Sequence, residues 1–396
     1  MEWFRNFYGV GHEFFEEKKC GFTACEIAHQ PQMWRDLAKD LKAQEEKIAA
    51  FMVKLGALKD VRIVLTGAGS SGFVGRAVAG FAAQLCGVYA EAIHTTDIVS
   101  APEMYFPAGI RGKKTLLISF ARSGNSPESV GAVEYARKMV KDLYEIAIVC
   151  DGTSKLANAS RETDKQLVLV MPEGTNDKGF AMTSSVSSMM LAGIAVLCAE
   201  RYDEICAEIP KIAEVVEKRG QTFANSAKEY AAFGFERAWY LGSGANFALV
   251  QEGALKMMEL TNGQVVSGCN SATEFRHGPK TVMNDKTLTI HFISPNAFTQ
   301  KYDEDLLKEL YEQRNGNWVV ALGITHEKIE HHVLEIEAGF AHCADIAVGL
   351  QGLVFMQLLS MFTSLQLGVP TDNPSPSGLV NRVVQGVTVY PYKGGA

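Results

Sequence analysis

The sequence predicts an α/β protein in which an N-terminal helical segment precedes two tandem doubly wound, flavodoxin-like parallel sheets. Short apolar, β-branched runs alternate with helical patterns along the chain, as a parallel sheet requires. The first strand of each half ends in a Gly/Ser-rich loop, and each half closes with an apolar helix. The chain has 396 residues, which is enough for two or three domains.

The predicted elements follow the same order in both halves, which suggests a duplicated α/β domain. Residues 1–50 are expected to be helical and amphipathic, with Trp34, Leu37, Leu41 and Ile48 on one face. Strands are predicted at Val61–Leu65, Thr115–Phe120, Ile146–Cys150 and Leu167–Met171, and again at Ala238–Leu241, Leu288–Ile293, Trp318–Gly323 and Asp345–Val348. The closing helices are predicted at Val186–Cys198 and Leu353–Leu367.

This order predicts four parts of the chain. They are a helical segment over residues 1–50, a first α/β domain over 51–205, a second over 206–370, and a tail over 371–396 that returns to the active site.

The composition excludes some classes of protein. A net charge of -7 argues against nucleic-acid binding, because no basic stripe is present to neutralise phosphates. The start of the chain has no signal-peptide pattern, and the apolar stretches Val186–Leu197 and Gly352–Phe362 are shorter than a membrane span. The eight cysteines are scattered without a CxxC motif. We therefore expect a cytoplasmic protein with reduced thiols and no membrane partner.

Two loops that follow neighbouring strands predict a phosphate site. Gly67–Gly72 matches the GxGxxG dinucleotide fingerprint, but the acidic residue expected about 20 residues further on is found slightly late, at Glu91. The next loop places Ser123 and Ser126 around a glycine just before a predicted helix. Each serine alone would be read as a helix cap or turn residue. Together, at the carboxyl ends of neighbouring strands, they favour a monophosphate held by hydroxyls and backbone amides.

A second polar cluster predicts proton transfer. Glu252, Lys256 and Glu259 are spaced four and three residues apart, so they share one face of a helix that is otherwise rich in Leu and Met. An ordinary solvated face with an ion pair is the alternative. A His-Gly-Pro turn follows at His277, and a carboxylate with an imidazole is a pair suited to acid–base chemistry.

Other chemistries have weaker signals. His331, His332 and His342 lack a carboxylate at metal-ligand spacing. Ser71 and Ser123 have no GxSxG elbow that would make them nucleophiles.

Together these motifs resemble the SIS (sugar isomerase) domain family. The resemblance is carried by Gly67–Ser71, by Ser123–Ser126, and by the pattern Glu-Gly-Ala-Leu-Lys-x-x-Glu…Glu-x-x-His-Gly-Pro over residues 252–279. The last pattern is similar to the isomerase half of glutamine-dependent glucosamine-6-phosphate synthase. The segment around Thr23–Pro31 and the tail from Asn373 to Val387 are similar to galactosamine-6-phosphate deaminase/isomerases. Both predicted sheets would then belong to SIS domains.

The resemblance implies a role for each matching residue. Glu259 would move a proton between C2 and C1, His277 would help to open the sugar ring, and Lys256 would support them. The phosphate would be held by Ser70, Ser71, Ser123 and Ser126, and the rest of the substrate would contact Gly69, Arg122 and Gln385. The family has a serine where this chain has Ala121, and its synthase members have a lysine where this chain has Gln385. No metal or other cofactor is implied, and the active site would be shared within a homodimer or larger homo-oligomer.

The implied reaction converts galactosamine 6-phosphate and water to tagatose 6-phosphate and ammonia. A glucosamine-6-phosphate deaminase and a plain aldose/ketose phosphosugar isomerase are the nearest alternatives. A non-catalytic sugar-phosphate sensor is a distant one, since no basic DNA-binding segment precedes the first domain.

Overall fold

The protein is described by a computed structural model, which covers residues 12–161, 163–313, 318–325, 333–336, 339–340, 343–384 and 386–393. The chain forms two compact units, each built around one sheet. The sheet A unit comprises Met33–Asn176, Ser184–Cys206 and Gly378–Ala396, and the sheet B unit comprises Met1–Gln32, Asp177–Thr183 and Ala207–Ser377. The predicted boundaries at residues 50, 205 and 370 stay predictions.

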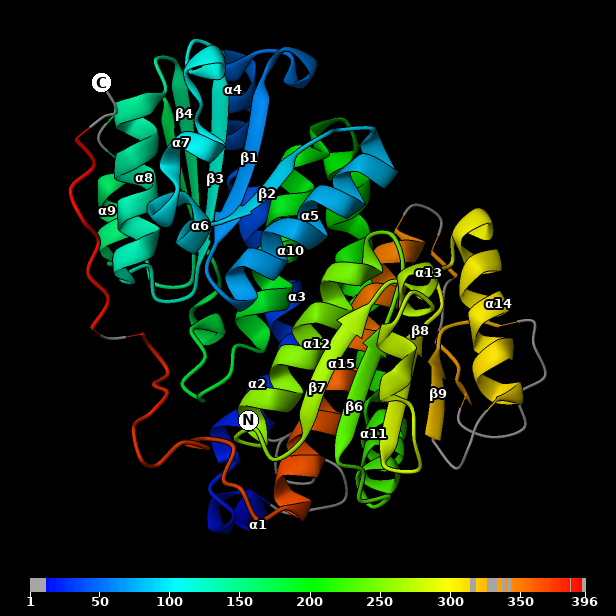
Figure 1. Ribbon diagram of the computed structural model, residues 1–396. Helices are drawn as coiled ribbons and strands as arrows, with labels where there is room; N and C mark the ends of the chain where they lie inside the picture. The colour runs from blue at the N-terminus through cyan, green and yellow to red at the C-terminus, as the bar shows by residue number, and fades with distance from the viewer. Residues whose placement is uncertain are drawn as a thin grey trace. The chain divides into compact units, whose positions relative to one another are not determined.

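Sheet A has five parallel strands in the order β2-β1-β3-β4-β5 (Figure 1). The strands are β1 (Arg62–Gly67), β2 (Glu91–His94), β3 (Thr115–Ala121), β4 (Leu143–Val149) and β5 (Gln166–Val170). Every residue of the central strand β3 is buried, so this strand reads as a continuous apolar run rather than as an alternating one.

Helices cover both faces of sheet A, as a doubly wound fold requires. One face packs against α6 (Thr95–Ser100) and α8 (Pro127–Met139) through a core that includes Val64, Leu117 and Ala147. The other face carries α5 (Ser70–Cys86) and α10 (Ser184–Leu197), where Gly193 allows a close approach to Val78 and Phe120. The remaining helices associated with this unit are α3 (Gln30–Ala43), α4 (Glu45–Leu55), α7 (Pro102–Tyr105) and α9 (Lys155–Ala159).

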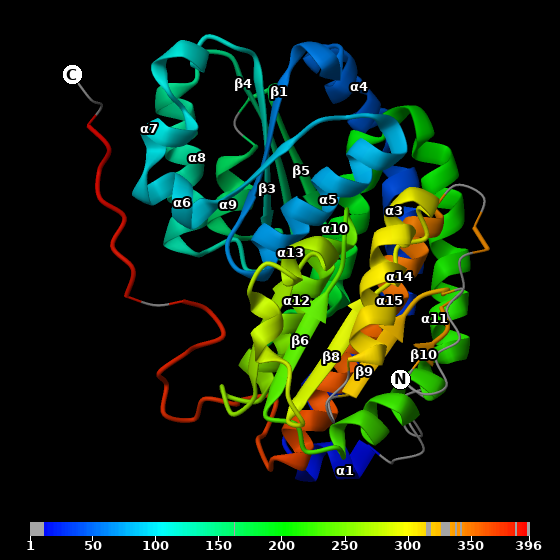
Figure 2. The same ribbon diagram turned by 45° about the vertical axis from the view of Figure 1, so that its right-hand side comes forward.

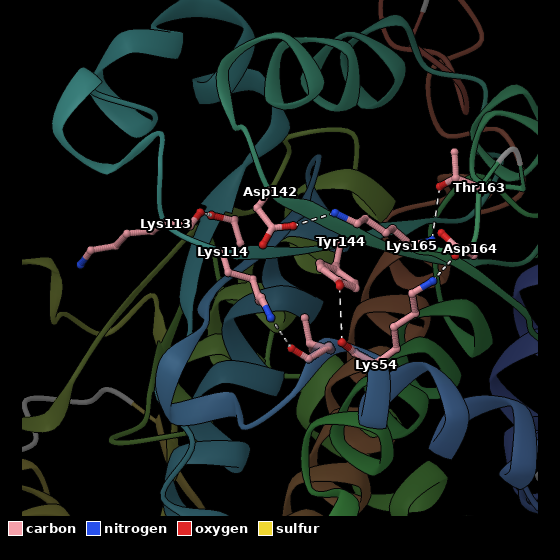
Figure 3. A network of polar contacts seen from close by, with 10 residues as sticks. Lys54, Lys113, Lys114, Asp142, Tyr144, Thr163, Asp164 and Lys165 are labelled. Carbon is pink, nitrogen blue, oxygen red and sulfur yellow. Dashed lines mark hydrogen bonds and ion pairs between the residues drawn. The ribbon is translucent and has the colours of Figure 1, made fainter.

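A polar network fastens α4 to the sheet at the end where β3, β4 and β5 begin (Figure 3). The Tyr144 hydroxyl donates to the Lys54 carbonyl over 3.4 Å, and Lys114 Nζ donates to the Leu55 carbonyl over 3.0 Å. Lys165 pairs with Asp142 at 2.8 Å and lies over the Tyr144 ring. Because Lys114 and Lys165 are bonded to groups of α4 and of the strand ends, we interpret the network as structural rather than as a binding site.

Sheet B repeats the strand order of sheet A. Its order is β10-β9-β8-β6-β7, which matches β5-β4-β3-β1-β2 strand for strand. The strands are β6 (Arg237–Leu241), β7 (Val266–Asn270), β8 (Thr287–Phe292), β9 (Trp318–Leu322) and β10 (Val333–Leu334), and all described pairings are parallel. The prediction of an α/β fold with parallel sheets is therefore confirmed.

Helices also lie on both faces of sheet B. Figure 2 shows α14 (Ala297–Glu312) in front of β8 and β9, and the core on that side includes Leu306, Leu307 and Phe275 of α13 (Ala272–Phe275). The opposite face packs against α12 (Asn246–Leu260) and α15 (Ala344–Gln366), where Gly352 lies against Phe292 of β8. The other helices are α1 (His12–Glu17), α2 (Gly21–Ala28) and α11 (Tyr202–Ala231). Short 3-10 turns occur at Leu58–Asp60, Ala108–Ile110, Glu173–Thr175, Ala199–Arg201 and Pro279–Val282.

One predicted strand is wrong, and three strands were not predicted. Asp345–Val348 forms the first turn of α15, because this short β-branched run continues into a helix that is buried on all sides. Two of the missed strands, β2 and β7, are the edge strands beside the first strand of each sheet, and their polar residues (Glu91 and His94, Ser267 and Asn270) give no apolar run. The third, β10, is an edge strand of only two residues. By length and composition α15 could cross a membrane, but its most apolar window is wholly buried in the protein, as in a core helix.

Candidate functional site

The first Gly/Ser loop joins β1 to α5 through backbone that requires glycine. Gly69, the residue before α5, has φ 54°, a left-handed conformation that side chains rarely adopt. A Cβ atom at Gly67 would lie 2.5 Å from the Ser71 carbonyl group. Ser70 and Ser71 are buried in the first turn of α5, where the Ser71 and Gly72 N–H groups donate to the carbonyls of Ala68 and Gly69. This loop can therefore bring two small hydroxyls and the positive end of the α5 dipole to an anion.

The second loop joins β3 to α8 and carries Arg122, Ser123 and Ser126. Ser126 caps α8 by accepting from the Ser129 N–H over 3.3 Å, and its hydroxyl lies 2.7 Å from that of Ser129. Ser123 is half-buried, and its hydroxyl accepts from the Asn125 N–H over 3.4 Å. The cap interpretation is thus correct for Ser126, but a cap hydroxyl at a helix N-terminus does not exclude a phosphate role.

The two loops leave the same edge of sheet A. Strands β1 and β3 pair directly, with Thr66 opposite Ser119, so the two strands end side by side. The sheet order changes direction at β1, with β2 on one side and β3 on the other. Ligands of open α/β sheets bind at such a point, outside the carboxyl ends of the strands. The positive ends of α5 and α8 also start here, which favours an anion.

The position of Glu91 argues against a dinucleotide-binding site at the first Gly/Ser loop. This residue starts β2 and lies opposite Val64 in the middle of β1, whereas His94 is the residue opposite Gly67 of the Gly/Ser loop. Its carboxylate accepts two hydrogen bonds from the Arg62 guanidinium, at 2.6 and 2.8 Å. Glu91 is thus engaged far along β1 from the loop that would hold a pyrophosphate.

The polar stripe of α12 is buried rather than solvated. Lys256 is fully buried, and its ammonium hydrogen-bonds Glu259 Oε2 and lies 3.3 Å from Glu252 Oε1. Glu252 is 1% exposed, whereas the Glu259 side chain is 27% exposed. The solvated-face alternative is therefore wrong, and Glu259 is the member of this cluster that solvent or a substrate can reach.

The electrostatics keep Lys256 charged. Burial by itself lowers the pKa of the Lys256 ammonium, but the neighbouring Glu252 and Glu259 carboxylates outweigh burial and raise that pKa above its usual value. A charged ammonium held in a low-dielectric site fixes the position of a carboxylate more firmly than a surface lysine would.

The structure does not bring His277 to this cluster within one chain. His277 lies in the turn after α13, its side chain is exposed, and its backbone N–H donates to the Glu274 carbonyl over 2.9 Å. Within the described residues no hydrogen bond or ion pair joins His277 to Glu259 or Lys256. An exposed histidine is available to a second molecule.

The Gly/Ser loop of sheet B is already occupied by the chain's own carboxylate. Ser243, in the loop after β6, donates to Asp303 Oδ1 over 2.6 Å, and the Ser294 N–H after β8 donates to Asp303 Oδ2 over 2.9 Å. Asp303 is fully buried, and His291 lies 3.8 Å away. This loop pair therefore differs from its sheet A equivalent, since an internal anion already takes its hydrogen bonds.

The tail passes the second loop of sheet A. The Arg122 guanidinium donates to the Arg382 carbonyl over 2.7 Å, and the Tyr392 hydroxyl donates to Glu103 over 2.8 Å. Gln385 lies outside the described residues.

His331, His332 and His342, which gave the weak metal signal, also lie outside the described residues. Among the residues that the structure describes, no group of three or more His, Cys, Asp or Glu side chains could hold a metal ion.

Two residues at the sheet A loops were missed from the sequence. His94 ends β2, and its ring lies so close to Gly72 that a Cβ there would be 2.3 Å from it. Burial lowers the pKa of His94. Glu128 is buried in the first turn of α8, and its Oε2 has no hydrogen-bond partner among the described residues. His94 carries no local sequence signal because the strand that positions it is too polar to predict.

The chain is also similar to known protein families and proteins. A model of the SIS domain matches residues 58–199. A D-galactosamine-6-phosphate deaminase, AgaS, from Shewanella sp. (strain ANA-3) is 38% identical over 383 residues, which are 94% of this chain and 92% of the relative.

Two solved structures are also similar. One from Clostridium novyi NT, proposed to be a tagatose-6-phosphate ketose/aldose isomerase, has a TM-score of 0.90 at 36% identity and covers 98% of this chain and 99% of its own. The tagatose-6-phosphate ketose/aldose isomerase of Escherichia coli has a TM-score of 0.84 at 32% identity, with 94% and 97% covered.

Proposed function

Because the chain belongs to the SIS-domain family, we propose that it is a galactosamine-6-phosphate deaminase/isomerase. The observation that carries the proposal is the fully buried Lys256 on α12, which holds Glu252 on one side and the accessible Glu259 on the other. Relatives across nearly the whole chain are named for this deamination. Both sheets are then SIS domains, since sheet B repeats the strand order of sheet A.

The proposed roles divide between binding and chemistry. The sheet A loops hold the 6-phosphate through the hydroxyls of Ser70, Ser71, Ser123 and Ser126, at the positive ends of α5 and α8. Gly69, Arg122 and Gln385 contact the remainder of the sugar. A firm grip on the phosphate restricts the open-chain sugar, which lowers the entropy cost of the proton transfer.

The proposed reaction runs in three steps. His277 assists the opening of the ring, which exposes an aldehyde at C1. Glu259 removes the C2 proton that this aldehyde acidifies, and a proton delivered to C1 turns the resulting enolamine into a C2 imine with a hydroxyl at C1. Water adds to the imine carbon and ammonia leaves, which yields tagatose 6-phosphate. Lys256 holds Glu259 in place during both proton movements.

Two further features complete the proposal. The exposed His277 supports a homodimer or larger homo-oligomer in which this residue serves a neighbouring chain. The eight cysteines are free thiols, which fits an enzyme of the reducing cytoplasm.

The test compares ammonia release from galactosamine 6-phosphate and glucosamine 6-phosphate, using wild type and Glu259→Gln. We expect release from the galacto sugar and a loss of kcat of about 100- to 10,000-fold in the variant, the range for removal of a general base. Release of ammonia from glucosamine 6-phosphate alone would mean that the substrate is this C4 epimer and not galactosamine 6-phosphate.

A second candidate, interconversion of tagatose 6-phosphate with an aldose phosphate, is favoured by the activity named for two similar structures. No ammonia from either amino sugar, together with such interconversion, would support it. Binding of phosphosugars without any turnover would instead support a sensor.

A further inference from the structure

The turn that carries His277 is held at one side by a buried aromatic ring. Phe275 ends α13 and is fully buried in the core shared with α14. Gly278, directly after the histidine, has φ 122°, which a residue with a side chain rarely adopts. The backbone around His277 is thus a defined turn rather than a loose loop, although the imidazole itself is exposed.

Two cations that bracket His277 converge on one carboxylate of α14. Arg276 Nε donates to Glu309 Oε2 over 2.6 Å, and Lys280 Nζ donates to Glu309 Oε1. Arg276 also reaches Asp305 Oδ2 at 2.8 Å. Glu309 therefore ties Arg276, just before His277, and Lys280, three residues after it, to one point on α14, a helix of 16 residues.

The three groups form a partly buried network rather than a solvated surface pair. The side chains of Arg276, Lys280 and Glu309 are 28%, 24% and 26% exposed. Burial alone would raise the pKa of Glu309, but the hydrogen bonds from Lys280 and Arg276 outweigh burial and lower it. Charged networks with this geometry hold their members more firmly than isolated exposed pairs do.

We propose that Glu309 is a positioning residue for His277, which fixes the direction of the imidazole by tying both sides of its turn to α14. The proposal rests on the proposed function, which assigns ring opening to His277. It holds for whichever chain's substrate His277 serves, since Glu309 and His277 belong to one chain. Small displacements of a catalytic group cost up to about 100-fold in rate, so such a tie would matter.

The test uses Glu309→Gln, with Glu312→Gln as the matched control because Glu312 is an exposed carboxylate at the end of the same helix. In the ammonia-release assay we expect kcat of Glu309→Gln to fall about 10- to 100-fold while KM stays close to that of wild type. Glu312→Gln should match wild type. In a His277→Asn background, adding Glu309→Gln should cost nothing further, because its effect passes through the imidazole.

Three results would overturn the proposal. The first is a wild-type kcat in Glu309→Gln, and the second is a raised KM as its main change. The third is a loss of kcat in the double variant equal to the product of the losses in the two single variants. Amide hydrogen exchange supplies a readout without activity, and residues 276–281 should exchange faster in Glu309→Gln than in Glu312→Gln. A wild type that releases no ammonia would contradict the proposed function instead. The exchange rates would then still decide, since equal rates in both variants mean that Glu309 does not hold the turn.

Discussion

Lys256 and Glu26 are buried ionisable groups of the same unit that differ in whether they are charged. Lys256 has carboxylates on both sides, so its ammonium stays charged in spite of complete burial. Glu26 on α2 is also buried, but it accepts from the backbone N–H groups of Lys178 and Gly179 and lies near Asp177. Burial first, and then the charge of Asp177, raise the pKa of Glu26 from 4.5 to about 8. The difference arises from the sign of the neighbouring groups.

The raised pKa of Glu26 predicts a loss of stability with rising pH. Between pH 4.5 and about 8 the folded chain keeps this proton while the unfolded chain releases it, so the free energy of unfolding falls across that window. Each pH unit contributes up to about 1.4 kcal/mol for one proton. Urea unfolding from pH 5 to 8 should give a flatter profile for Glu26→Gln than for wild type.

The matched control for this measurement is Glu312→Gln, which changes an exposed carboxylate. Its profile should run parallel to that of wild type. A Glu26→Gln profile parallel to both would show that Glu26 does not hold a proton in the folded chain.

At the scale of elements, glycines decide how closely the core helices approach the sheets. A Cβ at Gly352 of α15 would lie 2.2 Å from the ring of Phe292 in β8, and one at Gly253 of α12 would lie 2.6 Å from Met356. The long apolar helix α15 is thus fitted against sheet B rather than merely buried beside it. Close packing of this kind leaves no room for an added methyl group.

We predict that Gly352→Ala destabilises the protein by about 1 to 3 kcal/mol, the usual cost of overpacking a core. Gly220→Ala on α11 is the control, because nothing lies within 4 Å of the added Cβ, and it should stabilise the helix by about 0.5 to 1 kcal/mol. Urea midpoints of the two variants measure both effects. Equal midpoints would mean that α15 can shift away from β8 at no cost.

At the scale of the whole molecule, the exposure of His277 bears on assembly. Among the residues that the structure describes, no hydrogen bond or ion pair joins Glu259 to His277, yet the proposed reaction needs both. A symmetric dimer would supply each site with the partner's copy of the exposed residue.

Co-expression of Glu259→Gln with His277→Asn tests this arrangement. Each variant alone should be nearly inactive, but a mixed dimer keeps one intact pair if His277 crosses to the neighbouring chain. Random pairing would then restore about a quarter of the wild-type activity. A co-expressed sample as inactive as either parent would place both residues of a working pair on the same chain.

Some features of this protein follow from local sequence. The runs at Thr115–Phe120 and Ala238–Leu241, and the loops that follow Leu65 and Phe120, were predicted because a buried parallel strand and a glycine turn each leave a local pattern. The helical spacing of Glu252, Lys256 and Glu259 likewise placed them on one face of α12. Such features need only neighbours along the chain.

Other features were decided only by the tertiary structure. Whether the Lys256 face is solvated or buried, and whether Ser243 meets a ligand or Asp303, depends on residues far apart in the sequence. Thr23, in the N-terminal segment that carries part of the family resemblance, contacts the C-terminal part of the chain. Its N–H and its hydroxyl both donate to Asp372 Oδ1 over 2.8 Å. The sequence by itself determined most of the strands, the Gly/Ser loops and the order of the chemistry-bearing groups, while partners, burial and three edge strands came from packing. The physical reason is that periodicity and turn preferences act over a few residues, whereas burial and ion pairing join groups that only the folded chain brings together.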